Sequence, residues 1–263
     1  IVVTYPFWVS AHWLTIANQA LVAVVGSIAL MVLTGFAGQI SMGHAAFLAL
    51  GAYTTAILGT RWGVPFWMSL PLSGFCAAGV GLAIGFFALR LKGLYLAIVT
   101  IGLLVLVEHS LLAFPEWTQG HSGVRVPMHW WFPSADGTSA LPAFKDKVML
   151  GPLLFTFERK LFFLFLGITL VVMYVAKNII RSNTGRAMMA VRDHDLAAST
   201  LGVNPTRAKI LAFGISSFLA GIAGAMFAYK QTFISVNPPF NLNMSVAFIA
   251  MIVLGGMGTV YGA

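Results

Sequence analysis

The chain has 263 residues, of which 59% are hydrophobic and 8% are charged, and its mean hydropathy is +0.90. A water-soluble fold of this composition would expose far too much apolar surface, so the composition excludes an ordinary soluble domain and indicates an integral membrane protein. The net charge of +8 does not indicate a nucleic-acid partner, because the basic residues lie mostly in breaks between apolar runs, as in membrane loops.

Seven apolar runs approach the ~20 residues that cross a bilayer as a helix. They cover 14–33, 43–59, 66–89, 94–114, 161–177, 208–229 and 243–260. None alternates like a membrane barrel strand, and backbone groups in lipid must be paired within helices. We therefore predict an all-α fold, a polytopic membrane helical bundle that forms one transmembrane domain over 1–263. Apolar sequence reaches both ends, so we expect both ends to be truncated.

The connection after the first run is glycine-rich and uncharged, with "TGFAGQISMG" at 34–43. A broken helix near 35–43, as in transporters with discontinuous helices, would account for it, and so would a tight turn between helices. In a broken helix, the unwound backbone at Gly38 and the side chains of Gln39, Ser41 and His44 could contact a polar solute in a passage. Alternatively, these side chains bond neighbouring helices.

Two later runs carry further signals. Glu108 lies within 94–114, and an ionisable group inside a span by default marks a pathway or a paired interface. Counted at ~1.5 Å per residue, it lies roughly 20 Å along a ~30 Å core, so we prefer snorkelling to the interface and keep a place in the passage as the alternative. In 208–229, small residues at close-packing intervals predict a helix–helix interface. These are Gly214, Ser217, Gly221, Gly224 and Ala225.

Two connections are polar. Residues 115–160 contain Trp117, Trp130, Trp131 and several prolines, which suit an ordered cap at the membrane surface. Residues 178–207 form the other. Lys and Arg are divided almost evenly between the two sides of the membrane, so the positive-inside rule decides little. We assign 178–207 to the cytoplasm and 115–160 to the extracytoplasmic side.

The stretch "GRAMMAVRDHDLAASTLGVNP" at 185–205 is the most polar part of the chain. Each Arg or Asp at a helix centre costs roughly 2.5–3.5 kcal/mol of insertion free energy. Four such charges make insertion unfavourable by about 10 kcal/mol or more, so this stretch does not span the membrane. The composition favours helix, with Asn183 and Asp193 as candidate caps and Gly202 followed by Pro205 as a stop. Such a helix either lies on its own membrane face or docks a cytoplasmic partner.

No pattern of catalytic residues is present. The chain lacks the phosphate-binding GxxxxGK[ST] motif, its seven acidic residues form no carboxylate pair, and its six histidines show no metal-ligand spacing. We therefore expect no enzymatic activity, no metal and no cofactor.

Four blocks of the sequence carry a resemblance to a known family. The blocks are "LTGFAGQISMGHAAFLALGAYTTAIL" (33–58), "GLYLAIVTIG" (93–102), "GRAMMAVRDHDLAASTLGV" (185–203) continuing into "KILAFGISSFLAGIAGAMFAY" (209–229), and "VLGGMGTVYGA" (253–263). They resemble the permease subunits of ATP-binding-cassette importers for branched-chain amino acids, and LivM-type permeases in particular. Within the third block, "AASTLG" is similar to the Ala-Ala-x-x-x-Gly part of the EAA loop, with Leu196 where the motif has Glu.

The resemblance implies a multi-pass protein of the bacterial inner membrane, surrounded by lipid, that forms a passage for branched-chain or other neutral amino acids. Its implied partners are a second, LivH-like permease subunit, two cytoplasmic ATPases that hydrolyse the ATP, and an extracytoplasmic solute-binding protein. It also implies a short cytoplasmic coupling helix within 178–207. The implied coupling residues are Gly185, Arg186, Arg192, Asp193, Asp195, Ala197, Ala198 and Gly202.

Two other functions are compatible with the residues alone. A secondary transporter or channel for a solute such as urea or an amide would work without ATPases, although no conspicuous buried carboxylate for ion coupling is present. A membrane scaffold without a passage would leave the glycine break at 35–43 as packing.

Overall fold

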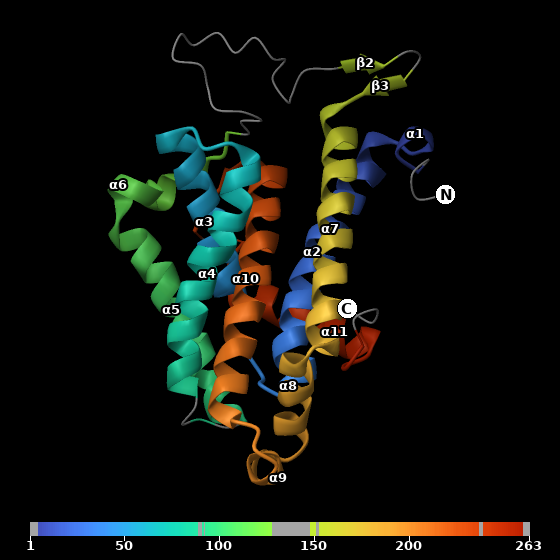
Figure 1. Cartoon of the computed structure of the whole chain (residues 1–263). Helices are drawn as coiled ribbons and strands as arrows, with labels where there is room; N and C mark the ends of the chain where they lie inside the picture. The colour runs from blue at the N-terminus through green and yellow to red at the C-terminus, as the bar shows by residue number, and fades with distance from the viewer. Residues whose placement is uncertain are drawn as a thin grey trace.

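The structure is a computed structural model that describes residues 5–88, 91, 93–127, 148–150, 153–236 and 239–259. Within these residues the chain is a bundle of helices with two small two-stranded sheets, which confirms the predicted all-α class (Figure 1). The helices are α1 (Tyr5–Trp8), α2 (Ala11–Leu30), the π-helix η1 (Met31–Phe36), α3 (His44–Trp62), α4 (Phe66–Ala88), α5 (Leu94–Ala113), α6 (Pro115–Thr118), the 3-10 helix η2 (Gly120–Ser122), α7 (Phe157–Arg181), α8 (Asn183–Asp193), α9 (Asp195–Thr200), α10 (Pro205–Gln231) and α11 (Leu242–Gly255).

Five helices in the described residues are long and apolar enough to cross a membrane. These are α2 with η1 (Ala11–Phe36), α4 (Phe66–Phe87), α5, α7 and α10. The predicted runs 43–59 and 243–260 also form helices, α3 and α11, but neither combines the length and the apolarity of these five. With 14 residues, α11 is only about 21 Å long, shorter than a ~30 Å core. In contrast, α3 has enough residues but is covered along most of its length by other helices.

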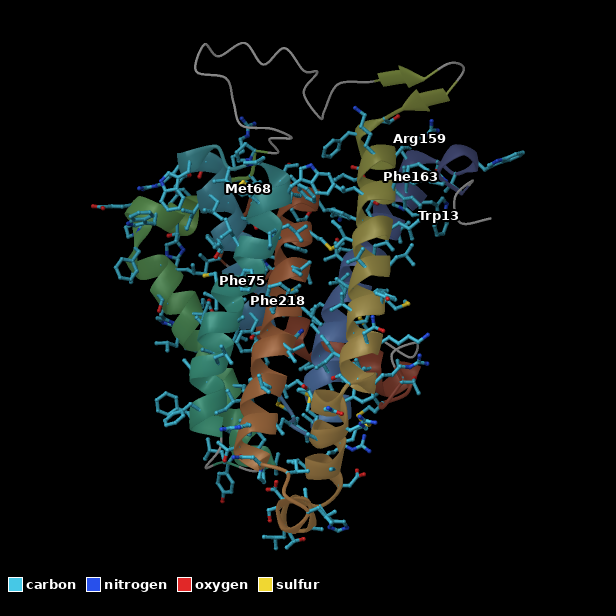
Figure 2. All side chains as sticks on the ribbon, viewed as in Figure 1. Trp13, Met68, Phe75, Arg159, Phe163 and Phe218 are labelled. Atoms are coloured by element: carbon cyan, nitrogen blue, oxygen red, sulfur yellow. The ribbon has the colours of Figure 1, made fainter. Side chains whose placement is uncertain are left out.

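The helix at the centre of the bundle is α10, which packs most extensively on α4, α3 and α2 (Figure 1). The predicted small-residue interface is confirmed, because all five residues of that set are buried on this helix. A Cβ added at Gly221 would lie 2.6 Å from the carbonyl oxygen of Ser73 on α4. Only glycine allows two backbones to approach this closely. Further along, Phe75 of α4 packs edge-on against Phe218 of α10, with ring centroids 5.0 Å apart (Figure 2).

Polar contacts join α2 to the helices beside it. The Ser216 hydroxyl donates to the carbonyl oxygen of Ala29 at 2.7 Å. Near the start of α2, the Asn18 amide donates to the Glu158 carboxylate at 2.9 Å. There, α2 and α7 are held together close to where Trp13, Arg159 and Phe163 lie (Figure 2).

The two polar connections lie at opposite ends of the bundle (Figure 1). At one end are α6, η2 and the strands β1 (Val124–Arg125), which pairs with β4 (Phe233–Ile234), and β2 (Val148–Leu150), which pairs with β3 (Leu153–Phe155). There the Arg61 guanidinium lies 4.2 Å from the centre of the Trp117 ring. Trp130 and Trp131 of the predicted cap lie outside the described residues. At the other end are α8 and α9.

Candidate functional site

The glycine-rich segment is a chain break inside the bundle. After η1, residues 37–43 are not helical, and α3 begins at His44. The His44 ring nitrogen Nε2 lies 3.0 Å from the carbonyl oxygen of Gly26. Gly26 precedes Phe36, the last residue of η1, by ten residues, or about 15 Å along the helix. His44 therefore lies about 15 Å back along α2 from the end of η1. The segment therefore turns back and runs into the bundle before α3 starts, as a broken helix does and a tight turn at the helix end does not.

Neighbouring helices pair part of this non-helical backbone. The Thr100 hydroxyl of α5 accepts from the Met42 amide at 3.0 Å, and the Ser245 hydroxyl of α11 accepts from the Ala45 amide at 3.0 Å. Irregular backbone within a membrane bundle persists only where protein covers it or where it lines a cavity. The contacts to α5 and α11 supply that cover.

Three side chains predicted to line a passage are buried here with unpaired polar atoms. Gln39, Ser41 and His44 are each at most 5% exposed. Both amide atoms of Gln39, the hydroxyl of Ser41 and the Nδ1 atom of His44 have no hydrogen-bond partner within the described residues. An unpaired buried polar group costs about 1–3 kcal/mol, so such groups are rare in protein interiors. Four such atoms lie within the six residues 39–44, at the break and the start of α3.

The polar stretch at 185–205 forms the two helices expected of it, but their caps were predicted one residue too late for α8 and one too early for α9. The Ser182 hydroxyl, rather than Asn183, accepts from the Gly185 amide at the start of α8. At α9 the N-cap position is His194 rather than Asp193. Helix α7 ends at Arg181 and α8 begins at Asn183, so Ser182 is the single residue between the two helices and caps the second one.

The turn after α9 follows the expected stop signal. Gly202 has a φ of 83°, which other residues rarely adopt. Asn204 then caps α10, its side-chain oxygen accepting from the Arg207 amide at 3.2 Å, and Pro205 opens that helix. The loop is thus ordered at both of its ends by local backbone chemistry.

The tip of this loop is apolar and exposed. Leu196, the second residue of the short helix α9, is 84% exposed, and Leu201, directly after the helix, is 83% exposed. Ala197 beside them is also exposed, whereas Ala198 is buried against Val191. Large apolar side chains this exposed at the far end of a polar loop indicate a contact surface rather than a solvated helix face.

The remaining coupling candidates do not gather at that tip. Gly185 is buried where α8 approaches the last turn of α7, at the carbonyl groups of Ile179 and Ile180. Arg186 is exposed and donates to Asn183. Asp193 is exposed and pairs with Arg192 at 2.9 Å. These residues shape the loop and its charge, and only Ala197 lies on the exposed apolar tip.

Arg192 joins the polar loop to the chain break. Its guanidinium donates to the carbonyl oxygen of Gly35, the fifth residue of η1, at 2.7 Å. At Gly38, which has a φ of 66°, a Cβ would lie 2.6 Å from the Cγ atom of Arg192. The two candidate regions, predicted separately, therefore meet directly through one arginine.

A cleft of about 230 Å³ opens at this junction. Gly38 and Gln39 line it from the break, and Arg192 and Asp195 line it from the loop. The Lys209 ammonium, from the first turns of α10, pairs with the Asp195 carboxylate at 2.8 Å. No sequence pattern singles out Lys209, which follows Asp195 by 14 residues across the Gly202 turn.

Glu108 lies apart from this junction. It lines a small recess with Ala49 of α3, Val236 and Phe240. It follows Thr100, which contacts the break, by eight residues, or about 12 Å along α5. The structure thus separates Glu108 from the other residues that were predicted to line a passage.

Comparison with known proteins shows the family to which the chain belongs. The family model described as "Branched-chain amino acid transport system / permease component" matches residues 13–263. The chain is 36% identical to the high-affinity branched-chain amino acid transport system permease protein LivM of Salmonella typhimurium, over 98% of this chain and 62% of that protein. It is also 36% identical to LivM of Escherichia coli, over 98% of this chain and 61% of that protein. The chain spans about three fifths of the length of these relatives.

A more distant relative is the autoinducer 2 import system permease protein LsrC of an Enterobacter species, 30% identical over 74% of this chain and 52% of that protein. No solved structure matches the chain. The family match extends over almost the whole chain and includes both the break and the polar loop. The chain therefore belongs to the family of branched-chain amino acid transport system permease components.

Proposed function

We propose that this chain is a permease subunit of an ATP-binding-cassette importer in the bacterial inner membrane, and that it forms part of a passage for branched-chain or other neutral amino acids. Its family and the names of its LivM relatives support this function. In this proposal it is a translocation subunit without ATPase activity. It works with a second permease subunit, two cytoplasmic ATPases and an extracytoplasmic solute-binding protein.

The polar loop 178–207 lies in the cytoplasm in this proposal and receives the ATPase at its apolar tip. Leu196 replaces the glutamate of the family motif, so the contact is apolar where a charged one would be expected. The exposed leucines at the start and just after the end of α9 provide that surface. The described parts of the connection 115–160, from α6 to β1 and from β2 to the start of α7, lie at the other end of the bundle (Figure 1). In this proposal, that end faces the solute-binding protein.

The observation that carries the proposal is the hydrogen bond from Arg192 to the Gly35 carbonyl. Movement of α9 by the ATPases would displace α8, and through Arg192 it would pull on η1 and on the break that follows. Gating of this kind requires an element with two arrangements whose balance a partner shifts. A break held by few backbone bonds is such an element.

Cysteine crosslinking tests the docking surface. In a background in which Cys76, the one native cysteine, is replaced by serine, we expect Leu196→Cys and Ala197→Cys to crosslink to an ATPase subunit in native membranes. Ala198→Cys is the matched control, because Ala198 is 3% exposed on the same helix. Equal crosslinking at all three positions, or none at the exposed pair with the ATPase present, would contradict docking through this tip.

Reconstituted uptake tests the class of transporter. Leucine uptake into proteoliposomes should require the ATPases, ATP and the solute-binding protein. Uptake by the permease subunits alone under an ion gradient would instead establish a secondary transporter, and this outcome would overturn the proposed function.

A further inference from the structure

Helix α7 has one face covered by the bundle and one open face. It lies at the edge of the bundle beside α2, on which it packs most extensively (Figure 1). Of the five spanning helices in the described residues, it is the least buried. Its buried residues recur at helical spacing, at Leu161, Phe165, Thr169, Val172 and Ala176. Exposed residues recur at helical spacing on the opposite, open face, at Leu170, Val171, Tyr174, Asn178 and Arg181.

The open face changes along its length as a bilayer does. Val171 is 61% exposed and Tyr174 is 67% exposed, and the exposed polar side chains of Asn178 and Arg181 follow at the end of the helix. Tyrosine is typical of the boundary between hydrocarbon and headgroups. Arg181 follows Leu161, where the apolar run begins, by 20 residues, or about 30 Å, which is the thickness of a hydrocarbon core. The Arg181 guanidinium therefore lies at the depth of the lipid headgroups.

This end of α7 carries an excess of positive charge. Residues 161–192 include no acidic residue, but they include four basic ones, Lys177, Arg181, Arg186 and Arg192. The next two acidic residues along the chain, Asp193 and Asp195, are paired with cations other than Arg181. A guanidinium can bind phosphate oxygens through two parallel hydrogen bonds, and basic residues at a membrane surface attract anionic lipid. An apolar face that ends in such charge is complementary to a molecule with acyl chains and a negative headgroup.

We propose that Arg181 binds the headgroup phosphate of an anionic phospholipid in the cytoplasmic leaflet, and that the acyl chains of this lipid lie along the open face beside Val171 and Tyr174. The choice of leaflet rests on the proposed function, in which 178–207 lies in the cytoplasm. Arg181 is the last residue of α7, and Gly185 of α8 is buried against the carbonyl groups of that last turn. The start of α8 therefore cannot shift unless the end of α7 shifts as well. A lipid bound here fixes the start of the polar loop.

Photocrosslinking tests the site. Tyr174 is replaced by the photoreactive p-benzoylphenylalanine, and the protein, purified with its associated subunits, is placed in nanodiscs with phosphatidylcholine as the major lipid and phosphatidylglycerol as the minor one. Mass spectrometry then identifies what is attached at position 174. We expect phosphatidylglycerol adducts about fivefold above the share of this lipid in the nanodisc, the enrichment that one basic residue supplies at a membrane surface. Arg181→Gln should abolish the enrichment, and Arg181→Lys should retain most of it.

Arg207→Gln is the matched control. Arg207 is also an exposed cation at this end of the bundle, but it belongs to α10, which is buried along most of its length. Its loss should leave the enrichment at position 174 unchanged. Arg181→Gln should also unfold at the same temperature as the unmodified protein in detergent without anionic lipid, because its side chain is exposed. A lower unfolding temperature there would mean that Arg181 has a structural role, and would overturn the assignment.

Three other outcomes would contradict the lipid site. Adducts with another protein subunit would mean that protein covers the open face. Adducts that match the lipid composition of the nanodisc would mean that lipid contacts α7 without a headgroup site. Enrichment that persists in Arg181→Gln would mean that another residue holds the headgroup.

Uptake measurements separate this inference from the proposed function. In vesicles that contain phosphatidylglycerol, we expect ATP-dependent leucine uptake to exceed that in pure phosphatidylcholine vesicles, and Arg181→Gln to lose this difference. If uptake depends on ATP but position 174 shows no enrichment, only the lipid site fails. If the enrichment is found but uptake never depends on the ATPases, the proposed function fails and the lipid site stands.

Discussion

Two regions of the molecule differ in how tightly they are packed. One is the contact of α10 with α3 and α4, and the other is the junction between the break and α8. At the first, glycine and serine bring helix backbones together until no additional methyl group fits, as at Gly221. At the second, polar atoms of Gln39 are buried without partners among the described residues, and a cleft of about 230 Å³ remains. Both regions are rich in small residues, but only one of them is filled.

This difference separates a fixed framework from an adjustable part. Close-packed interiors resist small displacements, because every shift breaks many contacts or creates clashes. A segment with unpaired groups and empty space beside it can change its arrangement at a lower cost. The contacts that it forms in the new arrangement compensate for those that it breaks in the old one. The chain thus has a closely packed region around α10, and in the proposed function the break and the polar loop move against it.

The largest expected effect comes from placing a larger side chain in the close contact between α10 and α4. Gly221→Val should destabilise the protein by roughly 3 kcal/mol, the upper end of the usual cost of overpacking, because its side chain would enter the backbone of α4. The measurement is thermal unfolding of the purified chain in detergent. Gly79→Ala on α4 is the control, since its Cβ would meet nothing within 4 Å. If both variants lost the same stability, the close approach at α10 would not be the cause.

A smaller but more specific effect should follow from cutting the connection between loop and break. Arg192→Met removes the bond to Gly35 and leaves the α9 tip intact. We expect leucine uptake per ATP hydrolysed to fall about tenfold, within the usual range of coupling energies, while the complex still assembles. Arg186→Met on the same helix is the control, because the exposed Arg186 side chain bonds its neighbour Asn183 and does not reach the break. Unchanged uptake in Arg192→Met would remove the proposed route of coupling.

The smallest effect concerns a single polar contact within the framework. Ser216→Ala deletes the hydroxyl that donates to Ala29 and should cost about 0.6 kcal/mol, the mean for such bonds between membrane helices. A slight decrease in unfolding temperature, with uptake unchanged, is the expected result. Loss of uptake without loss of stability would mean that Ser216 belongs with the break and the polar loop, and not with the closely packed region around α10.

Much of the framework could be predicted from the sequence, because it depends on local patterns. Apolar runs predicted the helices, and small residues at regular spacing predicted the closely packed face of α10. The two short helices of the polar loop also followed from composition, with caps in error by one residue. In contrast, the bond between Arg192 and Gly35 joins residues 157 positions apart. No local pattern encodes that meeting, nor the pairing of Lys209 with Asp195 that closes the cleft.

The covered position of α3 has a consequence for how the protein is made. This helix begins within the bundle at His44, ends at Arg61 and Trp62, and falls short of the apolarity of the five spanning helices. Its main cover is α10, which leaves the ribosome long after α3 has been synthesised. During that interval α3 has to be retained by the insertion machinery or by α4, since lipid alone is a poor solvent for it. A chain that stops before Pro205 therefore leaves α3 without its most extensive cover, although α4 still packs on it, and exposes that face to quality-control proteases.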